Sequence, residues 1–118
     1  MSIKIVVLAS GRGSNFEAIH AACQEGRIDG EIVGLFSDKE EAVALKTAEK
    51  YGLTHKAVIA KNYTDKIMYE KALVEELSQL DYDLIVLAGY MKVLGEHFLA
   101  SVQVPIMNIH PSLLPSFP

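Results

Sequence analysis

The sequence has few of the residues that mark disulfide-rich, metal-binding or membrane-spanning proteins. It holds one cysteine, Cys23, so no disulfide can form within the chain. Cysteine-based zinc sites need several Cys or His residues at set spacings, and that pattern is absent, so no metal is expected. The longest apolar runs, such as residues 5–9, fall far short of the roughly 20 residues of a membrane span. With no signal peptide either, the sequence predicts a reduced, cytosolic protein.

Charge of one sign is not concentrated anywhere along the chain. Lys and Arg number 11 and Asp and Glu 15, which gives a formal net charge of -4 without a basic cluster. General binders of nucleic acid or membrane surfaces need such a cluster, so neither partner is expected, and small molecules are the expected ligands. The 118 residues, half of them apolar, suffice for one globular domain.

Apolar runs alternate with amphipathic segments, a pattern typical of an α/β protein. Continuous apolar runs fit strands buried on both faces of a parallel sheet, and the segments between them have helical periodicity. The sequence therefore predicts a doubly wound, mainly parallel sheet, Rossmann-like in type. Strands are expected at residues 3–9, 32–36 and 84–88, and more weakly at 55–59 and 104–109, with a short helix at 96–101.

Capping residues predict where the other helices begin. Ser37 and Glu40 form a capping box. Asp38 lies past the second strand, where a dinucleotide-binding fold has its ribose-binding acid, but the capping box favours an acid in the first turn of the second helix that complements the helix dipole. Thr64 is the expected N-cap of the third helix. The predicted buried faces are Phe16, Ile19 and Cys23; Ala44, Leu45, Ala48 and Tyr51; and Tyr69, Leu73, Leu77 and Leu80.

A glycine-rich loop, residues 10–15, follows the first strand and opens the first helix. Glycines allow close backbone approach to a ligand, and the helix N-terminus favours an anion, so the loop predicts a phosphate site, although an unliganded tight turn has the same pattern. A dinucleotide fingerprint has a third glycine where this chain has Phe16. A phosphomonoester on a small substrate therefore fits better than a dinucleotide.

Two further loops lie where the carboxyl ends of strands bind ligands. In residues 108–115, Asn108 and His110 are two apart and would point to the same side of a strand. Such a pair suits a tetrahedral intermediate at a carbonyl, because both can stabilise an oxyanion and His can move a proton, yet it also fits a structural strand end. Residues 88–94 suit the wall of a pocket for a flat ring, or simple core packing.

These three loops together resemble the phosphoribosylglycinamide formyltransferases, folate-dependent enzymes of purine synthesis. The motifs are Gly11-Arg12-Gly13-Ser14-Asn15, Leu87-Ala88-Gly89-Tyr90-Met91-Lys92-Val93-Leu94 and Asn108-Ile109-His110-Pro111-Ser112-Leu113-Leu114-Pro115, in the family's order and spacing. The resemblance extends over the whole chain. It implies direct formyl transfer from 10-formyltetrahydrofolate to the amine of 5′-phosphoribosylglycinamide, in the pathway to IMP, without a metal.

The resemblance also implies roles for individual residues. Asn108 and His110 would be catalytic, and Gly89 would let the substrate amine approach. The phosphate of the ribonucleotide would lie on Gly13, Ser14 and Asn15. The folate would contact Asn108 and the residues Met91, Lys92, Val93 and Leu94, together with Lys66, which stands where the family often has an arginine.

The resemblance covers the N-terminal part of a single formyltransferase domain, truncated after the fifth strand. The family's catalytic aspartate has no counterpart among residues 1–118, so these residues alone are expected to lack useful activity and to self-associate through an exposed sheet edge near residues 104–109. Two other functions stay open. A formyltetrahydrofolate deformylase would share the Asn/His pair but lack the Gly-Ser-Asn loop, and a non-catalytic nucleotide-binding module would use the glycine loop alone.

Overall fold

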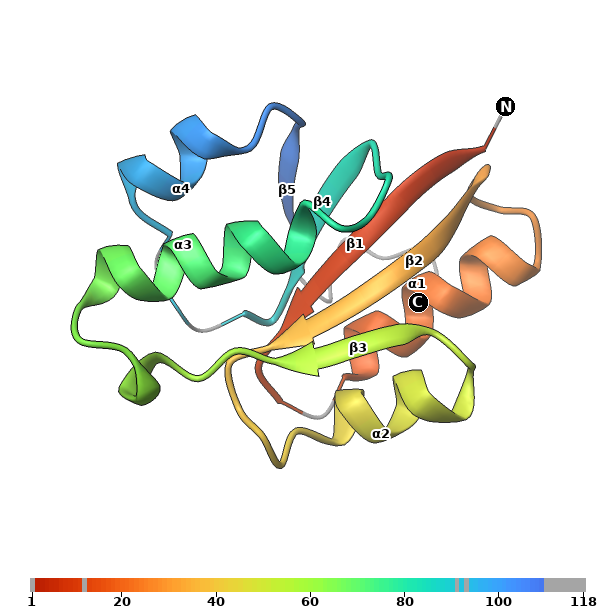
Figure 1. Cartoon of the computed structure of the whole chain (residues 1–118). Coiled ribbons are helices and arrows are strands. Elements are labelled where there is room, and N and C mark those ends of the chain that lie inside the picture. Colours follow the sequence, from red (N-terminus) through yellow and green to blue (C-terminus); the bar gives the residue numbers. More distant parts are fainter. Residues whose placement is uncertain (1, 12, 91, 93, 110–118) are drawn as a thin grey trace.

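The computed structural model describes residues 2–11, 13–90, 92 and 94–109, and it places helices on both faces of a central sheet (Figure 1). The strands are β1 (Ile3–Ala9), β2 (Gly30–Ser37), β3 (Thr54–Ala57), β4 (Leu84–Ala88) and β5 (Ile106–Ile109). The helices are α1 (Ser14–Gln24), α2 (Val43–Lys50), α3 (Lys66–Leu77) and α4 (Glu96–Ser101), with the short 3₁₀ helix η1 (Ala60–Asn62) before α3.

The sheet has five strands in the order β3-β2-β1-β4-β5, and every pair is parallel. The chain builds outward from β1 to β3 on one side and from β4 to β5 on the other. The predicted doubly wound sheet is therefore confirmed, with its topological switch point between β1 and β4. Ligands in such sheets bind at the carboxyl ends of the strands beside this point.

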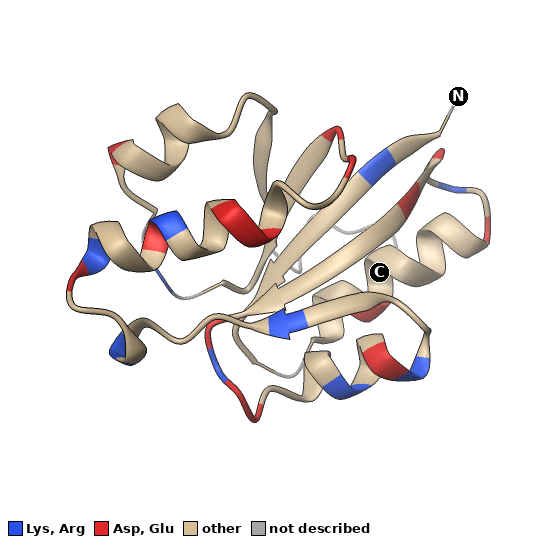
Figure 2. Ribbon diagram, in the orientation of Figure 1, with Lys and Arg blue, Asp and Glu red and all other residues tan. Residues whose placement is uncertain are grey.

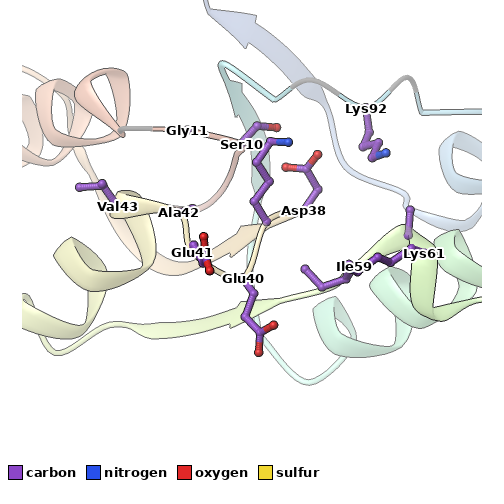
Figure 3. Close-up of a pocket in the computed structure, with 12 residues that line it drawn as sticks. Ser10, Gly11, Asp38, Glu40, Glu41, Ala42, Val43, Ile59, Lys61 and Lys92 are labelled. Carbon is purple, nitrogen blue, oxygen red and sulfur yellow. The ribbon is translucent and has the colours of Figure 1, made fainter.

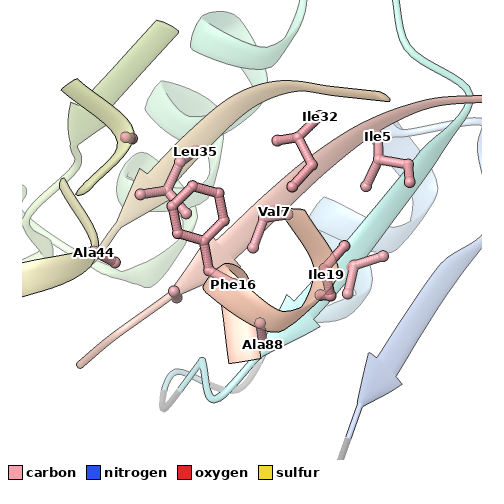
Figure 4. Packing of buried hydrophobic residues seen from close by; sticks show 11 residues of the cluster. Ile5, Val7, Phe16, Ile19, Ile32, Leu35, Ala44 and Ala88 are labelled. Atoms are coloured by element: carbon pink, nitrogen blue, oxygen red, sulfur yellow. The ribbon is translucent and has the colours of Figure 1, made fainter. Parts of the chain in front are cut away.

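The alternation of β1 residues divides the core into two clusters. Ile5, Val7 and Ala9 pack toward α1 and α2, whereas Val6 and Leu8 pack toward α3 and α4. Burial on both faces explains why β1 reads as a continuous apolar run. Figure 4 shows the ring of Phe16, which is fully buried, lying against the sheet beside Leu35 and Val7.

The predicted capping box at Ser37 is wrong. Strand β2 continues through Ser37, which pairs with Ala9 and Ala57, and α2 begins six residues later at Val43. The Ser37 hydroxyl instead accepts a hydrogen bond from the Lys39 N–H, 3.1 Å away, in a tight turn. Pairing with both neighbouring strands holds Ser37 extended, so local capping chemistry cannot start a helix there. Asp38 accordingly lies outside α2, not in its first turn.

The other expected elements need smaller corrections. Asp65, not Thr64, caps α3, because its Oδ1 accepts from the Met68 N–H at 2.9 Å. Strand β3 ends at Ala57 and β5 begins at Ile106, so both are shorter than predicted, while β2 is longer at both ends. The predicted short helix at residues 96–101 is confirmed, and the predicted helical faces of α1, α2 and α3 do pack onto the sheet.

Charged side chains of both signs are interspersed over the helices and loops (Figure 2). Within the part of the chain that the structure describes, no helix has the length and hydrophobicity needed to cross a membrane. Strands β3 and β5 form the two edges of the sheet. Self-association through β5 stays a prediction.

Candidate active site

The glycine loop after β1 is shaped by the packing of α1 against α2. Gly13 is the N-cap of α1 with φ of 82°, a backbone conformation that glycine adopts without strain. A Cβ at Gly13 would lie 2.8 Å from the Ala44 Cβ and 2.9 Å from its Cα. The Ala44 N–H also donates to the Gly11 carbonyl at 3.4 Å. A glycine is therefore required at position 13 by the fold itself, whether or not a ligand binds.

The N-terminus of α1 nevertheless has the features of an anion site. Its first N–H groups, those of Ser14, Asn15 and Phe16, have no acceptor within the helix, and no side chain caps it. Ser14 is exposed, whereas Asn15 is 8% exposed and its Oδ1 has no hydrogen-bond partner in the described structure. A half-turn of the Asn15 amide would present its NH₂ group there, as a donor toward an anion.

The loop after β4 opens with Gly89, which has φ of 73° and open space where a Cβ would lie. The next residue, Tyr90, has its hydroxyl hydrogen-bonded to that of Tyr69 on α3. Burial raises the pKa of both hydroxyls, and for Tyr90 the bond to Tyr69 raises its pKa further. Both tyrosines are therefore neutral at physiological pH. Met91 and Val93 lie outside the described residues.

The far end of this loop is fixed by a buried carboxylate. Glu70 on α3 is 1% exposed, and its Oε2 accepts from the Gly95 N–H at 2.7 Å while its Oε1 accepts from the Phe98 N–H at 3.2 Å. These amides belong to the N-terminus of α4, so Glu70 caps that helix from another element. The sequence analysis missed Glu70, although its spacing of three and seven residues from Leu73 and Leu77 places it on the buried face of α3.

The two lysines predicted to contact folate lie at one cavity. Lys66, the first residue of α3, and Lys92, in the loop after β4, both line a cavity of about 480 Å³ together with Tyr63, Asp65 and Tyr69. The Lys66 side chain also packs over Gly95, since its Cε lies 3.5 Å from where a Gly95 Cβ would be. The cavity thus combines aromatic walls with two ammonium groups. Leu94 is half-buried against the α3 side of the core.

Asn108 lies near the carboxyl end of β5, where it is in register with Leu87 of β4, and it is exposed. It is not among the residues that line the cavity formed by Lys66 and Lys92. His110 falls outside the described residues, so its predicted pairing with Asn108 stays a prediction. The other histidines are half-buried or exposed, as expected; His20 stacks on Tyr51 with ring centroids 3.9 Å apart.

The topology therefore brings the described parts of the first two predicted loops, together with Asn108, to the same end of the sheet. Strands β1, β4 and β5 are neighbours and parallel, so the glycine loop, the loop after β4 and Asn108 all lie at their carboxyl ends. An amide such as that of Asn108 can donate to an oxyanion that forms at a carbonyl.

The sequence model of the family described as formyl transferase matches residues 3–118, which is nearly the whole chain. The chain belongs to the formyl transferase family. Its α/β fold with an all-parallel sheet is that of the N-terminal domain of these enzymes.

Individual formyl transferases show how far the likeness extends. The phosphoribosylglycinamide formyltransferase of Escherichia coli is 38% identical over 116 residues, and that of Bacillus subtilis is 42% identical over 115 residues; each match covers 98% of this chain. The crystal structure of the phosphoribosylglycinamide formyltransferase from Brucella melitensis superposes with a TM-score of 0.87 at 42% identity, covering 100% of this chain and 62% of that one.

The chain spans little more than half the length of the curated relatives it matches, 55% of the Escherichia coli protein and 59% of the Bacillus subtilis protein. The loops described above all lie within the matched segment.

Proposed function

We propose that this chain contributes the phosphate-binding loop and the Asn/His pair to a phosphoribosylglycinamide formyltransferase. The enzyme transfers the formyl group of 10-formyltetrahydrofolate to the amine of 5′-phosphoribosylglycinamide, in the cytoplasmic pathway to IMP. The observation that carries the proposal is that the glycine loop, the loop after β4 and Asn108 lie together at the carboxyl ends of β1, β4 and β5. The identities of 38% and 42% with enzymes of that name support it.

The ribonucleotide phosphate occupies the N-terminus of α1 in this proposal. The backbone N–H groups of Ser14 and Asn15 donate to the phosphate oxygens, and the helix dipole favours the negative charge. The buried Asn15 amide adds a side-chain donor after its half-turn. Gly13 holds the loop in the conformation that directs these groups outward, and the amine end of the substrate extends toward Gly89, where no side chain blocks it.

The folate lies along the loop after β4. Its pteridine contacts Met91, Lys92, Val93 and Leu94, largely through their backbone groups, which read the edge of the ring. Its acidic tail lies in the cavity lined by Lys66 and Lys92. Lys66 provides charge but not the two parallel hydrogen bonds that an arginine forms with a carboxylate, so its contact is less directional.

The reaction is a direct acyl transfer. The amine nitrogen attacks the formyl carbon, so a new C–N bond forms and the carbonyl oxygen becomes an oxyanion. The amide of Asn108 and the imidazole of His110 donate hydrogen bonds to that oxygen. When the intermediate collapses, the bond from the formyl carbon to the folate nitrogen breaks, and His110 helps transfer the amine proton to that nitrogen. The products are the formylated ribonucleotide and tetrahydrofolate.

Hydrolysis of the same donor is the second function that the Asn/His pair would serve. A deformylase passes the formyl group to water and needs no phosphate site. The open N-terminus of α1, with the unpartnered buried Asn15 beside it, favours a phosphorylated acceptor over water.

A chimera tests the proposal at the level of products. Residues 3–118 of this chain replace the matching segment of the Bacillus subtilis relative, and the chimera is incubated with donor carrying a labelled formyl group. We expect the label on the ribonucleotide, with no turnover when the ribonucleotide is left out. Labelled formate formed without acceptor would identify a hydrolase. A folded chimera that binds both substrates and forms neither product would refute the proposal.

A further inference from the structure

A second cavity, of about 660 Å³, lies over the carboxyl ends of β1, β2 and β3 (Figure 3). It is lined by Ser10 and Gly11 after β1, by residues 38–43 after β2, by residues 59–61 after β3, and by Lys92. Of the residues given a role in formyl transfer, only Lys92 lines it. Its volume is in the range of about 300 to 1,000 Å³ that small-molecule sites occupy.

The polar group at the centre of this cavity is the carboxylate of Asp38. Asp38 is 6% exposed, and its Oδ1 has no hydrogen-bond partner in the described structure. Figure 3 shows the carboxylate directed into the cavity, between Ser10 and Lys92. A buried carboxylate oxygen without a donor is costly, because it has left water without gaining a replacement hydrogen bond. A ligand with hydroxyl or N–H donors would supply what the protein does not.

Positive charge lines the cavity beside Asp38. Lys61 and Lys92 are exposed and lie on the same side of Asp38 in Figure 3, and Lys39 also lines the cavity. None of the three takes part in the ion pairs found among the described residues. The acidic Glu40 and Glu41 lie farther from Lys92 in the same view. One end of the cavity therefore suits an anion, and its centre suits hydroxyl donors.

The end of the cavity away from Lys92 is open, and it presents the apolar Val43 beside the carboxylates of Glu40 and Glu41. Val43 is 50% exposed and lines the cavity next to Ala42 and Gly11. A Cβ at Gly11 would meet nothing within 4 Å, so the backbone there is accessible to a flat group. An apolar surface with accessible backbone beside it is typical of sites that bind the face and edge of a heterocyclic ring.

We propose that this cavity binds a ribonucleoside 5′-monophosphate. The 2′- and 3′-hydroxyls of the ribose donate to Asp38, the phosphate lies at Lys61 and Lys92, and the base lies over Gly11 and Val43. An acid at the end of the second strand of a doubly wound sheet has the position from which ribose hydroxyls are bound. The buried Phe16, which argues against a dinucleotide, lies on α1 and does not line this cavity.

The test is calorimetric titration of the 118-residue protein with four probes, AMP, its 2′-deoxy analogue, adenosine and inorganic phosphate. No formyl donor or acceptor is present, so the result does not depend on the proposed formyl transfer. We expect AMP to bind, and the 2′-deoxy analogue to bind at least about tenfold more weakly, because one hydrogen bond to a buried charge is lost. Adenosine and phosphate alone should each bind more weakly than AMP.

Variants then assign the contacts. In Asp38→Asn the preference for AMP over its deoxy analogue should disappear. In Lys61→Gln the affinity for AMP should fall, while the affinity for adenosine should not. Lys50→Gln, which removes an exposed lysine of α2 away from the cavity, is the matched control and should change neither affinity. Should Asp38→Asn fail to fold, the comparison of AMP with its deoxy analogue still tests the proposal on the unmodified protein. Equal affinity for the two nucleotides, or no binding of AMP, would overturn it.

Discussion

The Glu70 carboxylate on α3 accepts a hydrogen bond from the backbone N–H of Gly95, 2.7 Å away, although the two residues are 25 positions apart in the sequence. The same carboxylate accepts from Phe98, and so caps α4 in place of a local side chain. Gly95 ends the loop that begins at Gly89, and the proposed pteridine contacts, residues 91–94, lie between them in the sequence. A single buried acid thus ties the position of that loop to α3, which also carries Lys66 and Tyr69.

We expect Glu70→Ala to lower the free energy of unfolding by about 2 to 4 kcal/mol, because it removes two charge-assisted hydrogen bonds inside the protein. Glu70→Gln keeps one accepting oxygen, so its free energy of unfolding should fall by about half as much. Urea unfolding measures the loss, and hydrogen exchange at the Gly95 and Phe98 amides should accelerate in both variants. Glu75→Gln, on the same helix, is the control. Unchanged exchange at both amides in Glu70→Ala would show that Glu70 does not hold the loop.

Ser14→Glu tests the anion site without disturbing the fold. Ser14 is exposed at the first position of α1, where an added negative charge complements the helix dipole and should leave stability unchanged or slightly raised. The same charge repels phosphate, so the affinity of the chimera for the ribonucleotide should fall at least about tenfold. Gln24→Glu adds an equal charge at the other end of α1 and is the control.

Gly13 would be a poor choice for this test, because a Cβ there would clash with the Ala44 backbone. If Ser14→Glu bound the ribonucleotide as tightly as Gln24→Glu does, the glycine loop would be a turn between β1 and α1 and not a phosphate site.

The paired hydroxyls of Tyr69 and Tyr90 predict a loss of stability at alkaline pH. Burial raises the pKa of both above the ordinary value of about 10. Their contribution to stability is fully present below pH 10 and is lost as the pH rises from there toward the folded-state pKa values, because the unfolded chain releases these protons first. Tyr90→Phe should cost about 1 kcal/mol near pH 7, through the lost hydrogen bond.

Between pH 10 and 12, the free energy of unfolding of Tyr90→Phe should fall less steeply than that of the unmodified protein. Denaturant unfolding at a series of pH values gives both slopes. Tyr51→Phe, on the other side of the sheet, is the control and should retain the original slope. Identical slopes for the unmodified protein and Tyr90→Phe would contradict the assignment.

The strand and helix order was predictable from the sequence because the central strands β1, β2 and β4 are apolar runs buried between two layers of helices, and the helices between the strands have an apolar face. The residues at which these elements begin and end were less predictable. The capping box at Ser37 satisfies every local rule, yet pairing with Ala9 and Ala57 keeps that residue in β2. Pairing with strands distant in the sequence determines the conformation of Ser37, and the local sequence pattern carries no information about that pairing.

The candidate site was also predictable only in part. Its loops were predictable, since glycine and polar residues directly follow apolar strands. The support behind them was not, because Glu70 and the Tyr69–Tyr90 pair act through contacts between elements. Glu70 left one sequence signal, a carboxylate at an apolar position of α3.

The most direct test of the central claim is the single-turnover rate of formyl transfer by the chimera after His110→Ala or Asn108→Ala. In the proposed mechanism both side chains act on charge that exists only in the transition state, so the rate should fall by about 100- to 1,000-fold for each variant. The dissociation constant of the ribonucleotide should stay within about twofold, because the proposed phosphate site is at the N-terminus of α1. A variant that keeps most of its rate, or that loses ribonucleotide binding instead, would contradict the account.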